Sequence, residues 1–283
     1  MSGFSPSWLA LREPADRAAR NRDVLAVTAL YFAARTSVKV CDLGAGTGSS
    51  LRALAEFLPG EQDWTLIDYD AANLAAAREV LAAWADHSKT DSDRLRLEKN
   101  GKRIVVRFVQ QDFGHEAEWP DGTDLVMASA LFDLVSVVWL ERFVASLAKQ
   151  RTPLLAMLTA NGELNARPSH FLDEQIAASF RLHQTRDKGF GASAGADAAR
   201  LLEEILAESG YQPVGGESPW ILAHSPLLTE TANGIAAAVG ENGDVAPDAV
   251  QDWLSKTCMP GKTLVVGHRD VFAAPLTLTA AQA

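Results

Sequence analysis

The sequence predicts an α/β protein built on a doubly wound, mostly parallel β-sheet. Short apolar runs with strand character alternate with helical patterns from residue 38 to residue 159. The first of these strands runs directly into a cluster of glycines and then into a helix. This alternation favours a parallel sheet with helices on both faces. The expected strands are residues 38–41, 64–67, 104–109, 124–130 and 153–159, and the expected helices between them are residues 51–58, 71–85 and 135–148.

Further helices and strands flank this core. Residues 7–35 are predicted to be helical, and the highly charged residues 87–102 are predicted to be a solvated loop. The second half of the chain is less regular. Its expected helices are residues 171–186, 196–209, 227–239 and 247–257, its expected strands are residues 211–214, 220–223 and 263–273, and residues 189–195 are expected to be a flexible connection.

The composition is that of a folded globular protein with an acidic surface. The chain has 283 residues, of which 47% are hydrophobic and 22% are charged, with 26 Lys and Arg against 36 Asp and Glu. The net charge of −10 repels phosphate backbones and anionic lipid. We therefore expect neither extended nucleic acid nor a membrane as the partner, although a local basic groove on an acidic protein stays open.

The cysteines and the first residues bear on the location of the protein. Cys41 and Cys258 form neither a CxxC pair nor a dense disulfide framework. The chain does not begin with a basic segment followed by a signal-like apolar stretch, and the apolar residues 24–34 are too few to span a bilayer. A reducing compartment fits this pattern best, so we expect a cytoplasmic protein.

The glycine loop is the sharpest motif of the chain. Gly44, Gly46 and Gly48 stand at alternate positions immediately after the first strand. Glycine lets the backbone turn tightly and approach a ligand where a Cβ would collide, and the following helix offers unpaired N–H groups. A dinucleotide fingerprint reads G-x-G-x-x-G, whereas here the third glycine arrives one residue early. This spacing therefore argues against a nicotinamide cofactor, although it does not exclude one.

Carboxylates stand at the ends of the first three strands. Asp42 precedes the glycine loop and suits a cationic group, such as a sulfonium with an α-amino group, better than a pyrophosphate. Asp68 ends the second strand, where a carboxylate can accept hydrogen bonds from both ribose hydroxyls. Asp112 follows the third strand and is placed to accept from an exocyclic adenine amine, and Phe113 can lie on the ring.

Purely structural roles are the alternatives for the same residues. The glycines can form only a turn, and Asp42 can cap the following helix. Asp68 can cap a loop, and Asp112 can be an ordinary turn residue. The functional interpretation therefore depends on their combination.

In that combination the residues resemble the class I S-adenosylmethionine (SAM)-dependent methyltransferases. Residues 42–48 look like the first motif of that family, residues 67–70 with Leu74 and Ala77 look like its acidic motif, and Asp112 with Phe113 looks like its adenine-contacting position. The resemblance covers roughly residues 36–160 and implies SAM as cofactor and S-adenosylhomocysteine (SAH) as product. The cofactor-binding residues that it implies are Asp42, Gly44, Ala45, Gly46, Gly48, Asp68, Tyr69, Asp112, Phe113, Ser129 and Ala130.

The resemblance also implies a detailed fold. It implies a seven-stranded sheet in the order 3-2-1-4-5-7-6 whose last strand, residues 263–273, is antiparallel. Residues 223–262 depart from the pattern, because many members have only a short hairpin there. We expect a single domain made of N-terminal helices at residues 1–35, a SAM-binding core at residues 36–160, and an acceptor-side half at residues 161–283. Within this half, residues 161–195 and 223–262 are expected to form helical lid segments.

The end of the fourth strand gives information on the acceptor and on metals. It lacks the Asn/Asp-Pro-Pro-Tyr signature that amide- and adenine-amine methyltransferases of this class carry, so we do not expect those substrates. Ser129 and Ala130 are expected to hold the amino-acid end of SAM through their backbone carbonyls. Asp124 and Asp133 have no fixed partner for a magnesium triad, so we expect no metal.

A histidine of near-neutral pKa can serve as the base for a hydroxyl or amine acceptor. His183 is our catalytic candidate, because amide and charged side chains surround it beside a flexible connection; a solvated helix end is the alternative. His224 and His268 are further candidates, with an ordinary structural role as the alternative. On the N-terminal helices, Arg12, Arg17 and Arg20 can bind a carboxylate or form a solvated face.

We therefore predict a SAM-dependent methyltransferase that transfers the methyl group by in-line displacement to O or N of a small-molecule acceptor. One alternative is a protein or RNA methyltransferase. Another is a non-catalytic protein that binds SAM or SAH in a regulatory role. An NAD-dependent oxidoreductase is a third, and the sequence does not indicate an oligomeric state.

Overall fold

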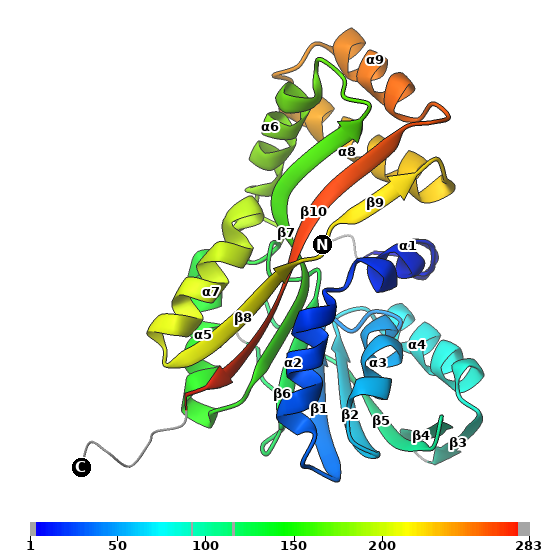
Figure 1. Ribbon diagram of the computed structural model, residues 1–283, viewed down its shortest axis with the longest axis vertical. Helices are drawn as coiled ribbons and strands as arrows, with labels where there is room; N and C mark the ends of the chain where they lie inside the picture. Colours follow the sequence, from blue (N-terminus) through cyan, green and yellow to red (C-terminus); the bar gives the residue numbers. More distant parts are fainter. Residues whose placement is uncertain (1–3, 92, 115–116, 277–283) are drawn as a thin grey trace.

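The computed structural model describes residues 4–91, 93–114 and 117–276. One long mixed sheet runs through the molecule, with helices on both faces of its lower part and a smaller lobe at its upper end (Figure 1). The strands are β1 (Ser37–Leu43), β2 (Glu61–Asp68), β3 (His87–Asp91), β4 (Arg94–Lys99), β5 (Lys102–Gln110), β6 (Leu125–Ser129), β7 (Leu154–Arg167), β8 (Tyr211–Glu217), β9 (Trp220–Ala223) and β10 (Thr263–Pro275).

The helices fall close to the segments that the sequence predicts. Pro14 does not break the first helix; the chain turns at Arg20, and the Asn21 side chain then caps the second helix by accepting from the backbone N–H groups of Asp23 and Val24. The helices are α1 (Pro6–Ala19), α2 (Arg22–Phe32), α3 (Ser49–Leu54), α4 (Ala71–Trp84), α5 (Val137–Gln150), α6 (Asp173–Gln184), α7 (Ala198–Glu208), α8 (Pro226–Asn242) and α9 (Pro247–Thr257), with short 3-10 turns η1 (Ala55–Phe57) and η2 (Gly195–Asp197).

The sheet is larger than the seven strands expected. Within the described residues it has ten strands, which follow one another as β3-β4-β5-β2-β1-β6-β7-β10-β8, with β9 also paired to β10. The central strand β1 is parallel to β2 and β6, whereas β10 is antiparallel to β7 and β8. The expected seven-stranded sheet was therefore incomplete, while the antiparallel last strand is confirmed.

The charged segment 87–102 is not the solvated loop that we expected. It forms β3, β4 and the start of β5, an antiparallel extension of the sheet edge. Charged residues hide the strand pattern, because only Leu95 and Leu97 on β4 alternate inward while every residue of β3 is exposed. The expectation was wrong because the high charge of the segment reflects an exposed edge strand and not a loop.

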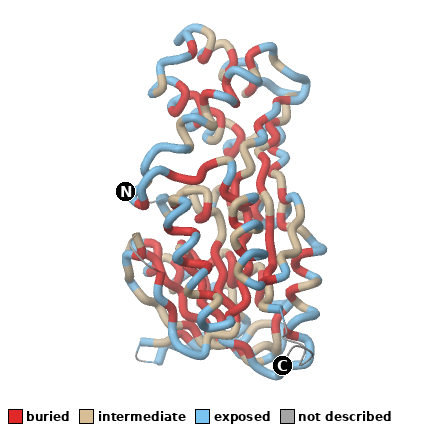
Figure 2. The backbone as a smooth tube through the Cα atoms, turned by 90° about the vertical axis from the view of Figure 1, so that its left-hand side faces the viewer, coloured by how far each residue is buried: buried red, intermediate tan, exposed pale blue. Residues whose placement is uncertain are grey.

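Two apolar cores lie on opposite faces of the lower sheet. Figure 2 shows that many residues in this part of the chain are buried. One core contains side chains of α2, α3 and α4, such as Phe32, Leu51 and Leu81. The other contains side chains of α5 and α7, such as Phe143 and Leu202. Both faces of the central strands are therefore buried, as the alternation of strands and helices predicts.

The upper lobe has its own core. β7 and β10 are long enough to continue past the lower sheet, where β9 joins β10. Helices α6, α8 and α9 pack on this extension around buried residues such as Ile176, Leu228 and Trp253 (Figure 1). The predicted lid segments, residues 161–195 and 223–262, thus contribute most of this lobe.

Among the described residues, no helix is both long enough and apolar enough to cross a membrane.

Candidate functional site

A cavity of about 480 Å³ lies where the carboxyl ends of β1, β2 and β6 meet α1. Ligands of open α/β sheets bind at this edge of the sheet. All of the predicted cofactor-binding residues except Asp42 and Gly48 line the cavity. These lining residues are Gly44, Ala45, Gly46, Asp68, Tyr69, Asp112, Phe113, Ser129 and Ala130.

The glycine loop has the backbone geometry that only glycine adopts freely. Gly44, Gly46 and Gly48 have φ angles of 68°, 54° and 72°. A Cβ on Gly46 would lie 2.9 Å from Cδ1 of Leu9 on α1. Gly48 lies outside the cavity wall and precedes α3 as its N-cap. The loop can therefore lie directly beneath α1 because position 46 has no side chain.

Asp68 is fixed by two backbone hydrogen bonds. Its Oδ2 accepts from the N–H of Gly46 at 2.7 Å, and its Oδ1 accepts from the N–H of Asp70 at 2.8 Å. Burial raises the pKa of Asp68, and these two hydrogen bonds lower it. The carboxylate at the end of β2 is therefore held against the glycine loop, where Asp68 lines the cavity.

An aromatic wall closes another side of the cavity. The backbone carbonyl of Phe113 accepts from Nε1 of Trp139 at 2.9 Å, and the ring centroids of Phe113 and Phe190 are 6.1 Å apart. Asp112 turns its Oδ1 to the backbone N–H of Gly114 at 2.9 Å. Residues 187–190, which follow α6, also line the cavity, so the upper lobe contributes to the site.

Asp42 is fully buried and does not line the cavity. Both of its carboxylate oxygens are buried, and they have no hydrogen-bond partner among the residues that the structure describes. The same holds for the three guanidinium nitrogens of the buried Arg20. Burial raises the pKa of Asp42 to about 8, Arg20 acts in the opposite direction, and Asp68 adds to the rise.

This raised pKa predicts that Asp42 makes the ligand-free protein less stable at alkaline pH. Between about pH 4 and pH 8 the folded state keeps a proton that the unfolded state has lost, so this group's contribution is full below about pH 4 and is lost as the pH rises through about 8. The change is at most about 1.4 kcal/mol per pH unit. We expect Asp42→Asn to raise the melting temperature at pH 8.5 and to change it much less at pH 5, measured by thermal unfolding. A variant that is less stable than the wild type at both pH values would contradict this.

An ion pair fastens α1 to the glycine loop. Nε of Arg52 on α3 donates to Oε1 of Glu13 at 2.9 Å, and its Nη1 donates to the carbonyl of Thr47 at 2.8 Å. Leu9, Arg12 and Asp16 of α1 line the cavity. Sequence reasoning did not find the role of Glu13 and Arg52, because the two residues lie far apart in the chain and form no motif.

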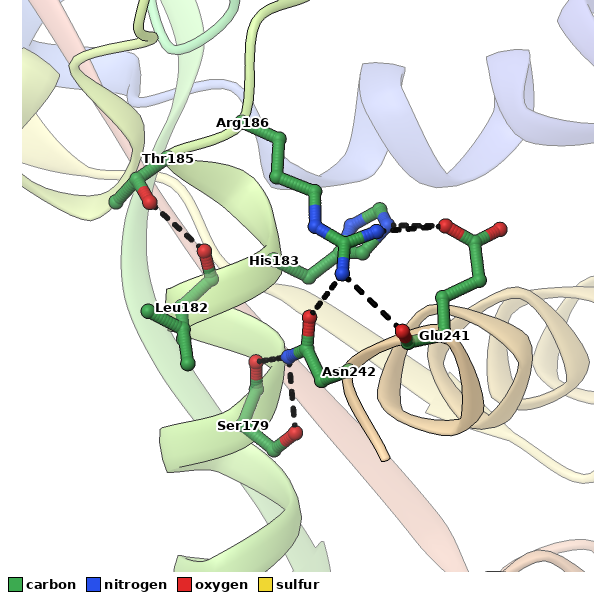
Figure 3. Close-up of polar contacts among 7 residues, drawn as sticks. All are labelled: Ser179, Leu182, His183, Thr185, Arg186, Glu241 and Asn242. Carbon is green, nitrogen blue, oxygen red and sulfur yellow. Dashed lines mark hydrogen bonds and ion pairs between the residues drawn. The ribbon is translucent and has the colours of Figure 1, made fainter. Parts of the chain in front are cut away.

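His183 lies outside the cavity wall. Its Nε2 is 3.0 Å from Oε2 of Glu241 on α8, and Nη1 of Arg186 donates to the same oxygen at 2.9 Å (Figure 3). Nη2 of Arg186 also donates to Oδ1 of Asn242 at 2.8 Å. These contacts join the end of α6 to the end of α8, and a catalytic role for His183 stays a prediction.

The other histidines have different surroundings. Nδ1 of His224 is 3.0 Å from the carbonyl of Cys258, and Nε2 of His170 is 3.1 Å from Oδ2 of Asp252. His268 is buried on β10, where its ring lies 5.2 Å from that of Trp220. Within the described ranges, His, Cys, Asp and Glu side chains form no group of three or more that suits a metal ion.

Comparison with solved structures finds similar folds at low sequence identity. YcgJ from Bacillus subtilis is 13% identical, with 91% of this chain and 100% of that chain covered and a TM-score of 0.53. A cyclopropane-fatty-acyl-phospholipid synthase-like protein from Lactobacillus casei is 16% identical, with 94% and 92% covered and a TM-score of 0.52. The cyclopropane synthase MmaA2 from Mycobacterium tuberculosis is 12% identical, with 96% and 94% covered and a TM-score of 0.50.

The similarity to these solved structures, together with the glycine loop after β1, identifies the fold. The chain has the fold of the class I SAM-dependent methyltransferases. No model of a protein family matches the sequence, and no curated protein sequence matches it either.

Proposed function

We propose that the protein binds SAM in the cavity and transfers its methyl group to O or N of a small-molecule acceptor. The observation that carries this proposal is that the glycine loop, Asp68 and the Asp112–Phe113 pair, three separate sequence signals, lie around one cavity. Bound SAM would supply a methyl group activated by the sulfonium, and the protein would position it for in-line displacement.

The lining residues fit the parts of SAM. Asp68, held by two backbone N–H groups, would accept from the ribose hydroxyls. The rings of Phe113 and Phe190 offer an apolar wall for the adenine, and Asp112 would accept from its amine. Ser129 and Ala130 at the end of β6 would hold the amino-acid end. The buried and unpartnered carboxylate of Asp42 would attract the positive charges of the ligand.

The proposed SAM site also gives a role to each part of the chain. Without β3, β4 and β9, the strands follow one another as β5-β2-β1-β6-β7-β10-β8, which we equate with the order 3-2-1-4-5-7-6. Residues 1–35 would then cover the cofactor, residues 36–160 would bind it, and residues 161–283 would serve the acceptor. β7 crosses the boundary between the last two parts, which supports a single domain. The cytoplasmic location stays a prediction.

Transfer of label from methyl-labelled SAM tests the proposal. The purified protein is incubated with labelled SAM and with small-molecule, protein and RNA fractions of a cell extract in separate reactions. We expect label only in the small-molecule fraction, because the net charge of −10 disfavours RNA. Label in protein or RNA would support a macromolecular acceptor, and SAM binding without any transfer would support a regulatory binding protein.

A further inference from the structure

A buried polar cluster adjoins the cavity at the junction of the two lobes. We call it the junction cluster, and it consists of Arg12 and Asp16 of α1, Asp133 after β6, Trp220 of β9 and His268 of β10. Nε of Arg12 donates to Oδ2 of Asp16 at 2.9 Å, and Nε1 of Trp220 donates to Oδ1 of Asp16 at 2.9 Å. The guanidinium carbon of Arg12 lies 4.8 Å from the centre of the Trp220 ring, whose other neighbour is the ring of His268.

Two hydrogen-bonding atoms of this cluster are unpaired. The Asp133 carboxyl group accepts from the backbone of Ala160, yet its Oδ1 is enclosed and has no partner within the described parts of the chain. His268 is buried, and its side chain is hydrogen-bonded to the backbone of Val266 and Ser218, whereas its Nδ1 has no partner in the same described parts of the chain. Buried polar atoms are nearly always hydrogen-bonded, so two unpaired atoms in one place offer hydrogen-bonding positions to a polar ligand.

The two atoms belong to one place in the fold. Ala160, whose N–H group bonds Asp133, is the register partner of His268 between β7 and β10. The charge of Arg12 acts on both Asp133 and His268. Arg12 and Asp16 themselves line the cavity, and so do Leu131 and Leu134 on either side of Asp133 in the chain. The junction cluster therefore borders the proposed SAM site through Arg12 and Asp16, whereas Asp133, Trp220 and His268 do not line the cavity themselves.

We propose that the junction cluster binds the methyl acceptor through a hydroxyl group, and that Oδ1 of Asp133 takes the hydroxyl proton during transfer. This inference rests on the proposed function. In the step, the acceptor oxygen forms a bond to the methyl carbon, the bond between that carbon and the sulfonium sulfur breaks, and its electron pair stays on sulfur. The O–H proton passes to Asp133, so the products are the methyl ether, SAH and a protonated carboxyl group.

The chemistry of the cluster favours a hydroxyl over the other common acceptors. A carboxylate has no proton to donate to Oδ1 of Asp133. An ammonium group has no lone pair with which to accept from Arg12 or to attack the methyl carbon. A neutral hydroxyl can donate to Asp133 and accept from Arg12. Burial also raises the pKa of Asp133, which makes its carboxylate a stronger base than an exposed aspartate.

The test uses three probes that share a benzene ring: phenol, benzoate and benzylamine. Their binding to the full-length protein saturated with SAH is measured by ligand-observed NMR, after SAH binding itself has been measured by calorimetry. We expect phenol to bind at least tenfold more tightly than the other two. We expect Asp133→Asn to weaken phenol binding at least tenfold and to leave the SAH affinity within threefold.

Two further variants keep this test decisive. Asp124→Asn is the matched control, because Asp124 precedes β6 and accepts from the N–H of Lys39 at 2.9 Å, at the other end of the strand from Asp133. It should not change phenol binding. His268→Phe keeps a ring but removes Nδ1, and it should weaken phenol binding even if Asp133→Asn does not fold.

The proton transfer is tested with labelled SAM and phenol as acceptor. We expect Asp133→Asn to lower kcat at least 100-fold with little change in the KM for SAM, and Asp133→Glu to restore part of the rate. Equal binding of the three probes, no binding of phenol, or bound phenol that the wild type does not methylate would each overturn the inference while SAH binding stands. Failure of SAH to bind would overturn the proposed function and this inference with it.

Discussion

Replacing Asp270 with alanine is expected to lower the free energy of unfolding by on the order of 3–5 kcal/mol, because it removes the acceptor of three donors, two of them buried. Asp270 is fully buried on β10. Its Oδ1 accepts from the N–H of Leu158 and from Oγ of Ser218, each at 2.7 Å, and its Oδ2 accepts from the N–H of Asn21 at 2.8 Å. These contacts join β7, the segment between β8 and β9, and the turn between α1 and α2.

The loss is measured as a shift in melting temperature. For a chain of this size, each kcal/mol corresponds to about 2–4 °C, so we expect a decrease on the order of 10 °C. Asp252→Ala is the control, because its side chain is 44% exposed and pairs with His170 at the surface. A decrease for Asp270→Ala no larger than that for the control would show that the three donors find other partners.

Replacing Gly46 with valine is expected to weaken SAH binding at least 100-fold. The φ angle of 54° is strongly unfavourable for a β-branched residue. In addition, the new Cβ would lie 2.9 Å from Cδ1 of Leu9, so α1 or the loop must move. Both effects act on the surface that we assign to the cofactor, and the affinity is measured by calorimetry.

A second glycine separates backbone strain from the close approach. Gly101, in the turn between β4 and β5, has a φ of 75°, and a Cβ there would meet nothing within 4 Å. Gly46→Val and Gly101→Val should both lower stability by on the order of 1–2 kcal/mol or more, but only the first should impair SAH binding. Equal SAH affinity in the two variants would mean that the cofactor does not lie at the glycine loop.

The site residues that could be predicted from the sequence are those at the carboxyl ends of the strands. Gly44, Gly46, Asp68 and Asp112 lie at or just after the ends of the parallel strands β1, β2 and β5, and the carboxyl ends of such strands meet at one edge whatever the details of packing. Asp42 also stands near a strand end in the chain, yet it is fully buried and does not line the cavity.

The packing of α1 and β10 around the site depends on contacts between residues that lie far apart in the sequence, which no local sequence pattern predicts. Glu13 meets Arg52, and Asn21 meets Asp270, across most of the fold. His183 was selected for its neighbours in sequence, but residues 187–190, which follow it, are the ones that reach the cavity. The charged edge strands β3 and β4 were taken as a loop for a related reason, since burial on one side of an edge leaves only two inward leucines as a signal.

Binding of SAM at the glycine loop is tested by a calorimetric titration of the purified, ligand-free protein with SAH, with NAD titrated in parallel. We expect saturable binding of one SAH per chain with a dissociation constant below about 100 μM, and no binding of NAD. A folded, ligand-free protein that gives no saturable signal with SAH, or that binds NAD in its place, would show that the cavity is not a SAM site.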